Sequence, residues 1–168
     1  IKHSNKKFGL VCDAGTPLIS DPGFKLVKEC VKNTIKITHV PGPSSLTSSL
    51  VLSGLPCDKF FFGGFLKKGK IKRKKQLENA LNAKFTSIWY ESPNRLAETL
   101  KLIIKINSDS SISVLRELTK LNEEIITGRA FDVYDQIIQK TKLKGEIVLV
   151  ISSKNKINYT KEMISDLI

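Results

Sequence analysis

Residues 13–23 have the sequence Asp-Ala-Gly-Thr-Pro-Leu-Ile-Ser-Asp-Pro-Gly, and the prediction of the fold starts from them. They follow the short apolar run at 8–12, which predicts a buried strand that ends where this loop begins. Open α/β sheets bind ligands at the carboxyl ends of their strands, so the loop is a candidate binding segment. Its glycine spacing matches neither a dinucleotide fingerprint nor a P-loop. The same residues also fit a tight loop that leads into a capped helix.

The first 56 residues alternate between strand and helix signals. Asp21 is placed to cap a helix that Pro22 opens, and residues 35–40 alternate as a second strand. Ser44 follows that strand and begins a second helix, which Gly and Pro residues end near position 56. Because a β-α-β-α order implies right-handed crossovers, we expect a parallel sheet in this first, partial lobe.

The rest of the chain predicts a second α/β lobe with a mixed sheet. A polar segment begins at residue 57, so we expect lobes over 1–57 and 58–152 and a tail with a short helix over 153–168. Within the second lobe we expect strands at 60–65, 86–90, 112–116, 123–127 and 147–151, and helices around Leu77, Leu96 and Val133.

The composition is that of a basic globular protein. The chain has 168 residues, 40% of them hydrophobic, and a formal net charge of +12, which favours a polyanionic partner such as RNA. Most of the cations are lysine, so codon bias explains part of this charge. No apolar run reaches the roughly 18 residues of a membrane span. Three cysteines without a C-x-x-C pair favour reduced thiols, and two isolated histidines give no metal site.

A second candidate binding segment has the sequence Pro-Gly-Pro-Ser-Ser at residues 41–45. It lies at the end of a predicted strand and at the start of a predicted helix. Free backbone N–H groups and the hydroxyls of Ser44 and Ser45 can hold a ligand carboxylate or a ribose there. Plain helix capping explains the same residues.

Three further motifs follow the two loops, the second of which continues with Ser-Gly-Leu-Pro at 53–56. They are Tyr-Glu-Ser-Pro-Asn-Arg-Leu at 90–96, Arg-Glu-Leu-Thr-Lys at 116–120 with Glu-Glu at 123–124, and Lys-Gly-Glu at 144–146. In order and spacing, the five motifs resemble those of the tetrapyrrole methylase superfamily, and within it the branch that methylates small-subunit ribosomal RNA. The resemblance covers about residues 8–152.

The resemblance implies two lobes with S-adenosylmethionine between them and methyl transfer to the ribose 2′-hydroxyl of a cytidine in 16S ribosomal RNA. It also implies a cytoplasmic enzyme that binds this RNA and forms a homodimer. Carried over by position, the residues that contact S-adenosylmethionine are Asp13, Ala14, Gly15, Ile19, Ser44, Ser45, Glu91 and Leu118.

The sequence departs from the family pattern at its ends. The family opens with a strand and a Thr-Pro-Ile-Gly-Asn loop that borders the cofactor, and this chain begins at Ile1 without them. We therefore expect a piece of a longer protein whose cofactor pocket lacks one wall. Two alternatives stay open: a methyltransferase of the same fold that acts on a corrin or porphyrin precursor, and a basic RNA-binding fragment without activity.

The charged residues of the second lobe are candidates for catalysis and RNA binding. Glu91, Glu117 and Lys120 follow predicted strands, and each is a candidate base for the hydroxyl proton. Arg95 and Arg116 can grip phosphates in a bidentate manner. A structural network of ion pairs explains the same residues.

A basic run occupies residues 67–75, where seven of nine residues are Lys or Arg. Contacts from this run, including Lys72 and Arg73, predict salt-sensitive binding of RNA phosphates. A solvated helix face is the alternative. Trp89 and Tyr90 lie in an apolar strand and are predicted to be core residues, not stacking platforms for bases.

Overall fold

The computed structural model describes residues 6–140 and 142–152, and the chain divides into two compact units, 1–48 and 49–168. Each unit is described by itself. The lobe boundary that we expected after residue 57 stays a prediction, and the tail at 153–168 lies outside the described residues.

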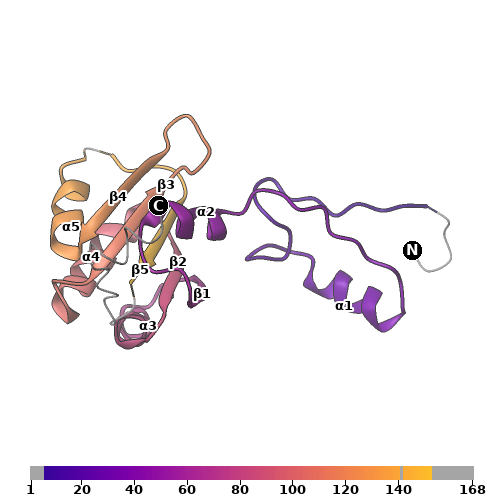
Figure 1. Ribbon diagram of the computed structural model, residues 1–168, viewed down its shortest axis with the longest axis horizontal. Coiled ribbons are helices and arrows are strands. Elements are labelled where there is room, and N and C mark those ends of the chain that lie inside the picture. Colours follow the sequence, from indigo (N-terminus) through magenta and orange to yellow (C-terminus); the bar gives the residue numbers. More distant parts are fainter. Residues whose placement is uncertain (1–5, 141, 153–168) are drawn as a thin grey trace, which may run out of the picture. The chain divides into compact units, whose positions relative to one another are not determined.

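Unit 49–168 is built around a five-stranded mixed sheet with the strand order β1-β2-β5-β3-β4 (Figure 1). Strands β1 and β2 are parallel, and the β2–β5, β5–β3 and β3–β4 pairs are antiparallel. This confirms the predicted α/β class and the mixed sheet of the second lobe. The strands are β1 (Phe60–Phe65), β2 (Thr86–Glu91), β3 (Ser111–Arg116), β4 (Glu124–Arg129) and β5 (Ile147–Ile151).

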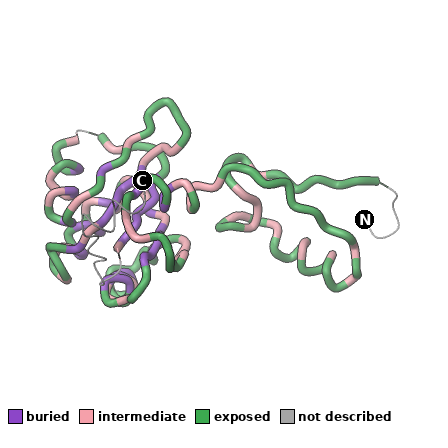
Figure 2. The backbone as a smooth tube through the Cα atoms, viewed as in Figure 1, coloured by how far each residue is buried: buried purple, intermediate pink, exposed green. Residues whose placement is uncertain are grey.

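Three helices cover one face of this sheet: α3 (Lys70–Asn82), α4 (Pro93–Ile106) and α5 (Ala130–Ile138). Their apolar stripes form one core with Trp89 and the inward residues of β3 and β5, and Figure 2 shows the buried residues gathered there. The prediction that Trp89 is a core residue is confirmed. The same prediction is wrong for Tyr90, which is only partly buried and lies outside this core because its ring contacts Phe62 and Phe65. On the opposite face, the second half of α2 (Ser45–Ser53) is attached through Thr127, whose hydroxyl donates to the Ser53 carbonyl at 3.2 Å.

A β-bulge in β1 lets the indole ring of Trp89 lie against the strand. Phe62 pairs with Ile88 and Phe65 with Tyr90, so Gly63 and Gly64 together face one residue of β2. A Cβ atom on Gly63 would lie 2.1 Å from the indole ring. The position therefore requires glycine for close approach.

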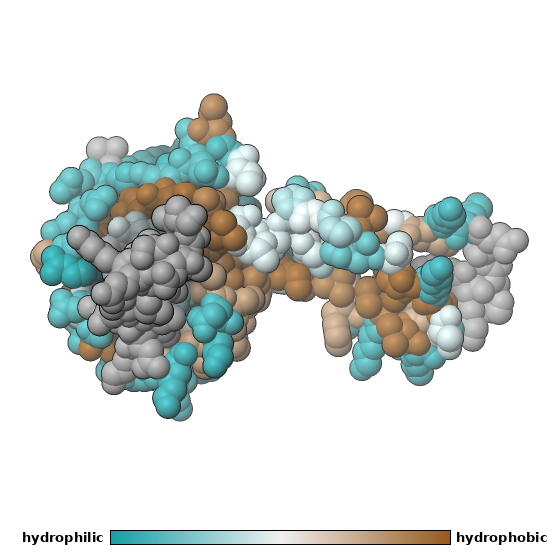
Figure 3. Space-filling model, in the orientation of Figure 1, coloured by the Kyte–Doolittle hydropathy of each residue, from teal (hydrophilic) through white to brown (hydrophobic). Residues whose placement is uncertain are grey.

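In the other unit, the predicted strands at 8–12 and 35–40 are wrong for this structure. Described residues 6–44 contain the helix α1 (Phe24–Lys32) and no strand, and no residue from 6 to 48 is buried. Figures 2 and 3 show this unit with exposed backbone and apolar side chains at its surface; Val11, for example, is 85% exposed. The physical reason is that a strand needs a hydrogen-bonded neighbour, and the described residues supply none.

Helix α1 also begins later than predicted. Its N-cap is Gly23, with φ 128°, and not Asp21. A Cβ on Gly23 would lie 2.6 Å from Leu10 and 3.1 Å from Leu18, so glycine lets the loop at 13–23 fold against the segment that precedes it. No helix among the residues described is both long enough and apolar enough to cross a membrane.

Replacement of Gly63 by alanine tests the bulge. We expect Gly63→Ala to lower the free energy of unfolding by about 1–3 kcal/mol, because the new methyl group overlaps the Trp89 ring. Trp89 is the only tryptophan of the chain, so its fluorescence follows urea unfolding directly. Gly69→Ala is the matched control, because nothing lies within 4 Å of its Cβ position, and it should cost less than about 1 kcal/mol. Equal losses for the two variants would contradict the packing argument.

Candidate functional site

The two predicted cofactor loops lie together in unit 1–48. The hydroxyl of Thr16 donates a hydrogen bond of 3.3 Å to the carbonyl of Pro43, which joins the loop at 13–23 to the loop at 41–45. The Cys12 thiol donates to the carbonyls of Ala14 and Gly15 at 3.3 and 3.4 Å. The first loop is therefore a closed turn, and Asp13, Ala14, Gly15 and Ile19 are exposed on it.

Ser44 and Ser45 occupy the start of helix α2. The Ser44 carbonyl accepts the Ser48 N–H at 3.0 Å, so the helical hydrogen bonds begin there. The first turn contains no acidic residue. This helix end therefore presents the positive end of the backbone dipole without a competing carboxylate, which suits an anionic or hydroxyl-bearing ligand group.

Glu91 lies at the end of β2 with its side chain fully buried. Its Oε1 accepts the Ser92 N–H at 2.7 Å and lies 2.5 Å from Nη2 of Arg95, and its Oε2 accepts the Thr99 hydroxyl at 2.7 Å. Both oxygens are thus engaged by the first two turns of α4. The carboxylate fixes the start of that helix to the strand before it.

Arg95 extends this network to the end of β1. Its Nη1 donates to the Leu66 carbonyl at 3.3 Å, and the Leu66 N–H donates to the Tyr90 carbonyl at 3.1 Å. One residue later, the Lys67 N–H donates to Oε1 of Gln76 at 2.9 Å. Arg95 is therefore held by protein groups at three points, counting Glu91 and the Ser92 hydroxyl, and it ties the segment after β1 to α4.

Glu117 and Lys120 meet in the loop after β3. Oε1 of Glu117 accepts the Glu146 N–H at 2.9 Å and the Lys120 ammonium at 3.0 Å, and Lys120 also reaches Oε2 of Glu146 at 3.0 Å. These contacts, the Glu146 N–H first, lower the pKa of Glu117 below its ordinary 4.5. The two carboxylates raise the pKa of Lys120 above 10.5, so it is a cation at neutral pH. A Cβ on Gly145 would lie 2.4 Å from the Glu117 carboxyl, so glycine is needed beneath it.

Leu118 is partly exposed between two residues in the left-handed region. Glu117 has φ 51° and Thr119 has φ 64°. The Thr119 N–H donates to Oε2 of Glu123 at 2.6 Å, which closes the loop from its other side. Non-glycine residues persist in this region only where surrounding contacts hold them. The loop is therefore a fixed turn that presents Leu118.

Arg116 is engaged by protein groups as well. Its Nε donates to Oε2 of Glu124 at 3.1 Å, and its Nη1 donates to the Lys144 carbonyl at 3.2 Å. Lys140 binds the other oxygen of Glu124 at 2.5 Å, and this contact is the main cause of a lowered pKa at Glu124.

The basic run at 67–75 presents lysines, and its arginine is buried. Lys72 is exposed, as are the other lysines of the run. Arg73 is 2% exposed, and its Nη2 lies 2.5 Å from Oε2 of Glu98 on α4. Its Nε and Nη1 find no partner among the described residues. The structure therefore places Arg73 in the α3–α4 interface and not on the surface where we expected an RNA contact.

Several residues of these networks were not singled out from the sequence. Glu124 and Glu146 stood in quoted motifs without a role, whereas Thr99, Glu98 and Lys140 carry no local signal because only the packing of distant elements gives them partners. Among the residues described, no group of three or more His, Cys, Asp or Glu side chains is placed to hold a metal ion.

Comparison with known proteins gives the family. The profile of the Tetrapyrrole (Corrin/Porphyrin) Methylases matches residues 2–134, which is most of the chain. The chain belongs to this family. Its resemblance to the branch named for small-subunit ribosomal RNA is confirmed by relatives called Ribosomal RNA small subunit methyltransferase I. That of Hydrogenobaculum sp. is 44% identical over 91% of this chain, and that of Thermotoga maritima is 42% identical over 89%.

This family member spans only part of those relatives. The aligned region is 66% of the length of each of these two proteins and 51% of the Rickettsia prowazekii relative, which is 47% identical over 85% of this chain. Solved structures agree on the fold. The methyltransferase CobJ matches with a TM-score of 0.59 at 15% identity, covering 86% of this chain and 64% of that one. Uroporphyrin-III C-methyl transferase from Thermus thermophilus, complexed with S-adenyl homocysteine, matches with a TM-score of 0.52 at 15% identity. This match covers 82% of this chain and 62% of that one.

The Glu91–Arg95 pair is tested by removal of its cation. We expect Arg95→Met to lower the free energy of unfolding by about 2–4 kcal/mol, because it leaves a buried carboxylate without its partner. Arg129→Met is the control, since Arg129 forms an exposed pair with Asp132 and should cost less than about 1 kcal/mol. Urea unfolding measures both. A similar small loss in the two variants would show that the Glu91 network contributes little.

The lowered pKa of Glu117 predicts a pH dependence. A carboxylate whose pKa is lower in the folded state stabilises it above the unfolded pKa, and this contribution is lost as pH falls through the folded value. We therefore expect the melting temperature to fall as the pH drops below the ordinary carboxyl pKa of 4.5. The fall should be smaller in Glu117→Gln, which should be less stable at pH 7. Glu78→Gln, at a surface pair with Lys74, should keep the full dependence. An unchanged pH profile in Glu117→Gln would contradict the assignment.

Proposed function

We propose that this chain is part of an S-adenosylmethionine-dependent enzyme that methylates the ribose 2′-hydroxyl of a cytidine in 16S small-subunit ribosomal RNA. The observation that carries the proposal is the identity of 42–44% with proteins named Ribosomal RNA small subunit methyltransferase I over about nine tenths of the chain. The exposed lysines of the basic run support a polyanionic substrate. They favour RNA over a corrin or porphyrin precursor. A ribosomal substrate also supports a cytoplasmic location, and a homodimer stays a prediction.

The loops of unit 1–48 fit the polar groups of S-adenosylmethionine. The start of α2 at Ser44 and Ser45 suits its carboxylate or a ribose hydroxyl, and the Asp13 carboxylate can accept hydrogen bonds from hydroxyl or amino groups. Ala14, Gly15 and Ile19 lie on the same closed turn. That Leu118 and Glu91 contact the cofactor stays a prediction. When bound, S-adenosylmethionine supplies a methyl group on a sulfonium centre that a hydroxyl oxygen can attack in line.

Of the three candidate bases, the contacts favour Glu117. The Glu91 carboxylate is enclosed by groups of α4, and Lys120 keeps its proton at neutral pH because its pKa is raised. Glu117 is ionised, and its Oε2 accepts no hydrogen bond among the residues that the structure describes. We propose that Oε2 takes up the hydroxyl proton and that Lys120 holds the carboxylate in place. Glu91 and Arg95 then act as positioning residues, and Arg116 orients the hairpin through Glu124.

The reaction is tested with tritium-labelled S-adenosylmethionine and small ribosomal subunits that lack the modification. We expect label in alkali-resistant dinucleotides that contain cytidine, because 2′-O-methylation blocks alkaline cleavage of the following phosphodiester. The full-length Thermotoga maritima relative is the positive control. Label on a base would contradict ribose transfer. Label from the relative alone would show that this chain is inactive without further sequence.

Cofactor placement is tested by filling the start of α2. We expect Ser45→Trp to weaken binding of S-adenosylmethionine at least about tenfold in calorimetry, because the indole fills the space at the start of this helix. Val51→Trp introduces the same side chain on an exposed position of the same helix and should leave the affinity unchanged. Equal affinities for the two variants would move the cofactor away from this loop.

A further inference from the structure

Strand β1 presents aromatic rings at an open edge of the sheet. It stands first in the strand order, and among the described residues no strand pairs with its outer side. Phe60 and Phe61 are each 48% exposed, and Phe65 is 57% exposed. An exposed apolar edge strand invites pairing or aggregation unless something covers it. The outer edge of β1 is therefore a candidate binding surface.

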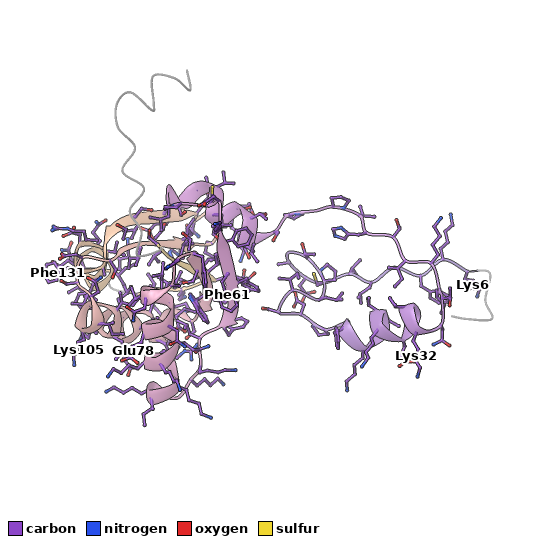
Figure 4. The ribbon with its side chains drawn as sticks, turned by 60° about the horizontal axis from the view of Figure 1, so that its bottom comes forward. Lys6, Lys32, Phe61, Glu78, Lys105 and Phe131 are labelled. Atoms are coloured by element: carbon purple, nitrogen blue, oxygen red, sulfur yellow. The ribbon has the colours of Figure 1, made fainter. Side chains whose placement is uncertain are left out.

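Two rings of β1, Phe62 and Phe65, form a cluster with Tyr90 of the neighbouring strand β2. We call this cluster the aromatic edge. The Tyr90 ring contacts Phe62 and Phe65 edge to face, with centroid distances of 5.1 and 5.2 Å. Since successive residues of a strand point to opposite faces, Tyr90 lies on the face away from Trp89 and its helices. Phe61, labelled in Figure 4, contacts Trp89 and belongs to that helix side. Phe65 is the most exposed ring of the cluster.

A band of cations begins two residues beyond Phe65. Six exposed lysines and no acidic residue occupy positions 67–75, and the exposed Ile71 lies among them. The first turn of α3 has no acidic residue and no side-chain cap. The band therefore presents positive charge and backbone N–H groups beside the aromatic edge. Rings for bases next to cations for phosphates are the combination that binds single-stranded nucleic acid.

The connection between the rings and the lysines is fixed. Leu66 and Lys67 are held by hydrogen bonds to Tyr90, Arg95 and Gln76, as described above. Leu66 is itself buried. The spacing from Phe65 to Lys67 and Lys68 is therefore set before any ligand arrives, which lowers the entropic cost of binding.

We propose that the aromatic edge and the lysines at 67–75 bind a single-stranded segment of the RNA substrate, with one base stacked on Phe65 and the flanking phosphates on Lys67, Lys68 and Lys70. This rests on the proposed function, because it names the surface that receives its substrate. Charge favours RNA over a second copy of the chain. Antiparallel pairing of two β1 edges would bring the lysine bands of both copies beside Lys59 and Lys84, and like charges repel.

The test measures binding of a fluorescein-labelled, single-stranded 12-nucleotide RNA by anisotropy, with this chain and its variants. Phe65→Leu keeps an apolar side chain and removes the ring, and we expect the affinity to fall about tenfold with an unchanged salt slope. Phe131→Leu is the matched control, because Phe131 is 51% exposed on α5, away from β1 (Figure 4). It should bind like the parent chain. Trp89 fluorescence and the melting temperature check that each variant is folded.

The lysines are tested separately. Replacing Lys68 and Lys70 by glutamine should lower the slope of log Kd against log salt by about 1.4, because each phosphate contact to a single strand contributes about 0.7. As a further control for the ring, Phe65→Tyr keeps an aromatic side chain at this position and should bind the RNA as tightly as the parent chain.

The outcomes separate this proposal from the proposed function. Phe65-dependent RNA binding would support the surface even if this chain transfers no methyl group. Equal affinities for Phe65→Leu and Phe131→Leu would overturn the surface even if methyl transfer is found. A dimer in sedimentation that Phe65→Leu converts to monomer, with RNA affinity unchanged, would assign the edge to self-association and overturn the proposal.

Discussion

The Glu91 side chain carries a carboxylate and has no exposed surface. The need to give this buried carboxylate partners fixes the positions of several neighbouring elements in unit 49–168. A buried carboxylate is costly unless every oxygen has a partner, and here α4 supplies them through Ser92, Arg95 and Thr99. The pairing sets the start of α4 against the end of β2. Through the hydrogen bond from Arg95 to the Leu66 carbonyl, it also fixes the position of the segment after β1. One buried carboxylate therefore holds together α4, the β1–β2 pair and the start of the basic run.

The elements of the second unit could be predicted from local pattern because each signal agreed with its surroundings. Pro93 at the first helical position, the β-branched run at 147–151 and the apolar stripe of α4 all describe segments whose partners the chain contains. The strands expected at 8–12 and 35–40 have equally good patterns. A strand, however, is a property of two paired segments, and no pattern within one of them reports whether its neighbour is present.

The sequence predicted where the candidate charged residues lie relative to the strands, but it did not predict which groups they contact. Glu91 lies at the end of β2 and Glu117 directly after β3, as expected, and Arg95 lies in the first turn of α4. Their partners come from elements that are distant in sequence, and those partners decide whether a charge faces solvent or a neighbour. Arg73 shows this most clearly: it is one cation in a run of seven, yet its position on α3 turns it toward Glu98, while the lysines beside it stay exposed.

The strand order has a consequence for synthesis. Strand β5 is the last of the described strands along the chain but the middle one in the sheet, between β2 and β3. Until Ile151 has left the ribosome, the β1–β2 pair and the β3–β4 hairpin are two halves without the strand that joins them. Non-local pairing of this kind slows folding, and until β5 pairs with β2 and β3 the two halves expose unpaired strand edges. Completion of this sheet thus depends on β5 (Ile147–Ile151), so a ribosome stalled before this strand emerges would hold an unfinished and aggregation-prone sheet.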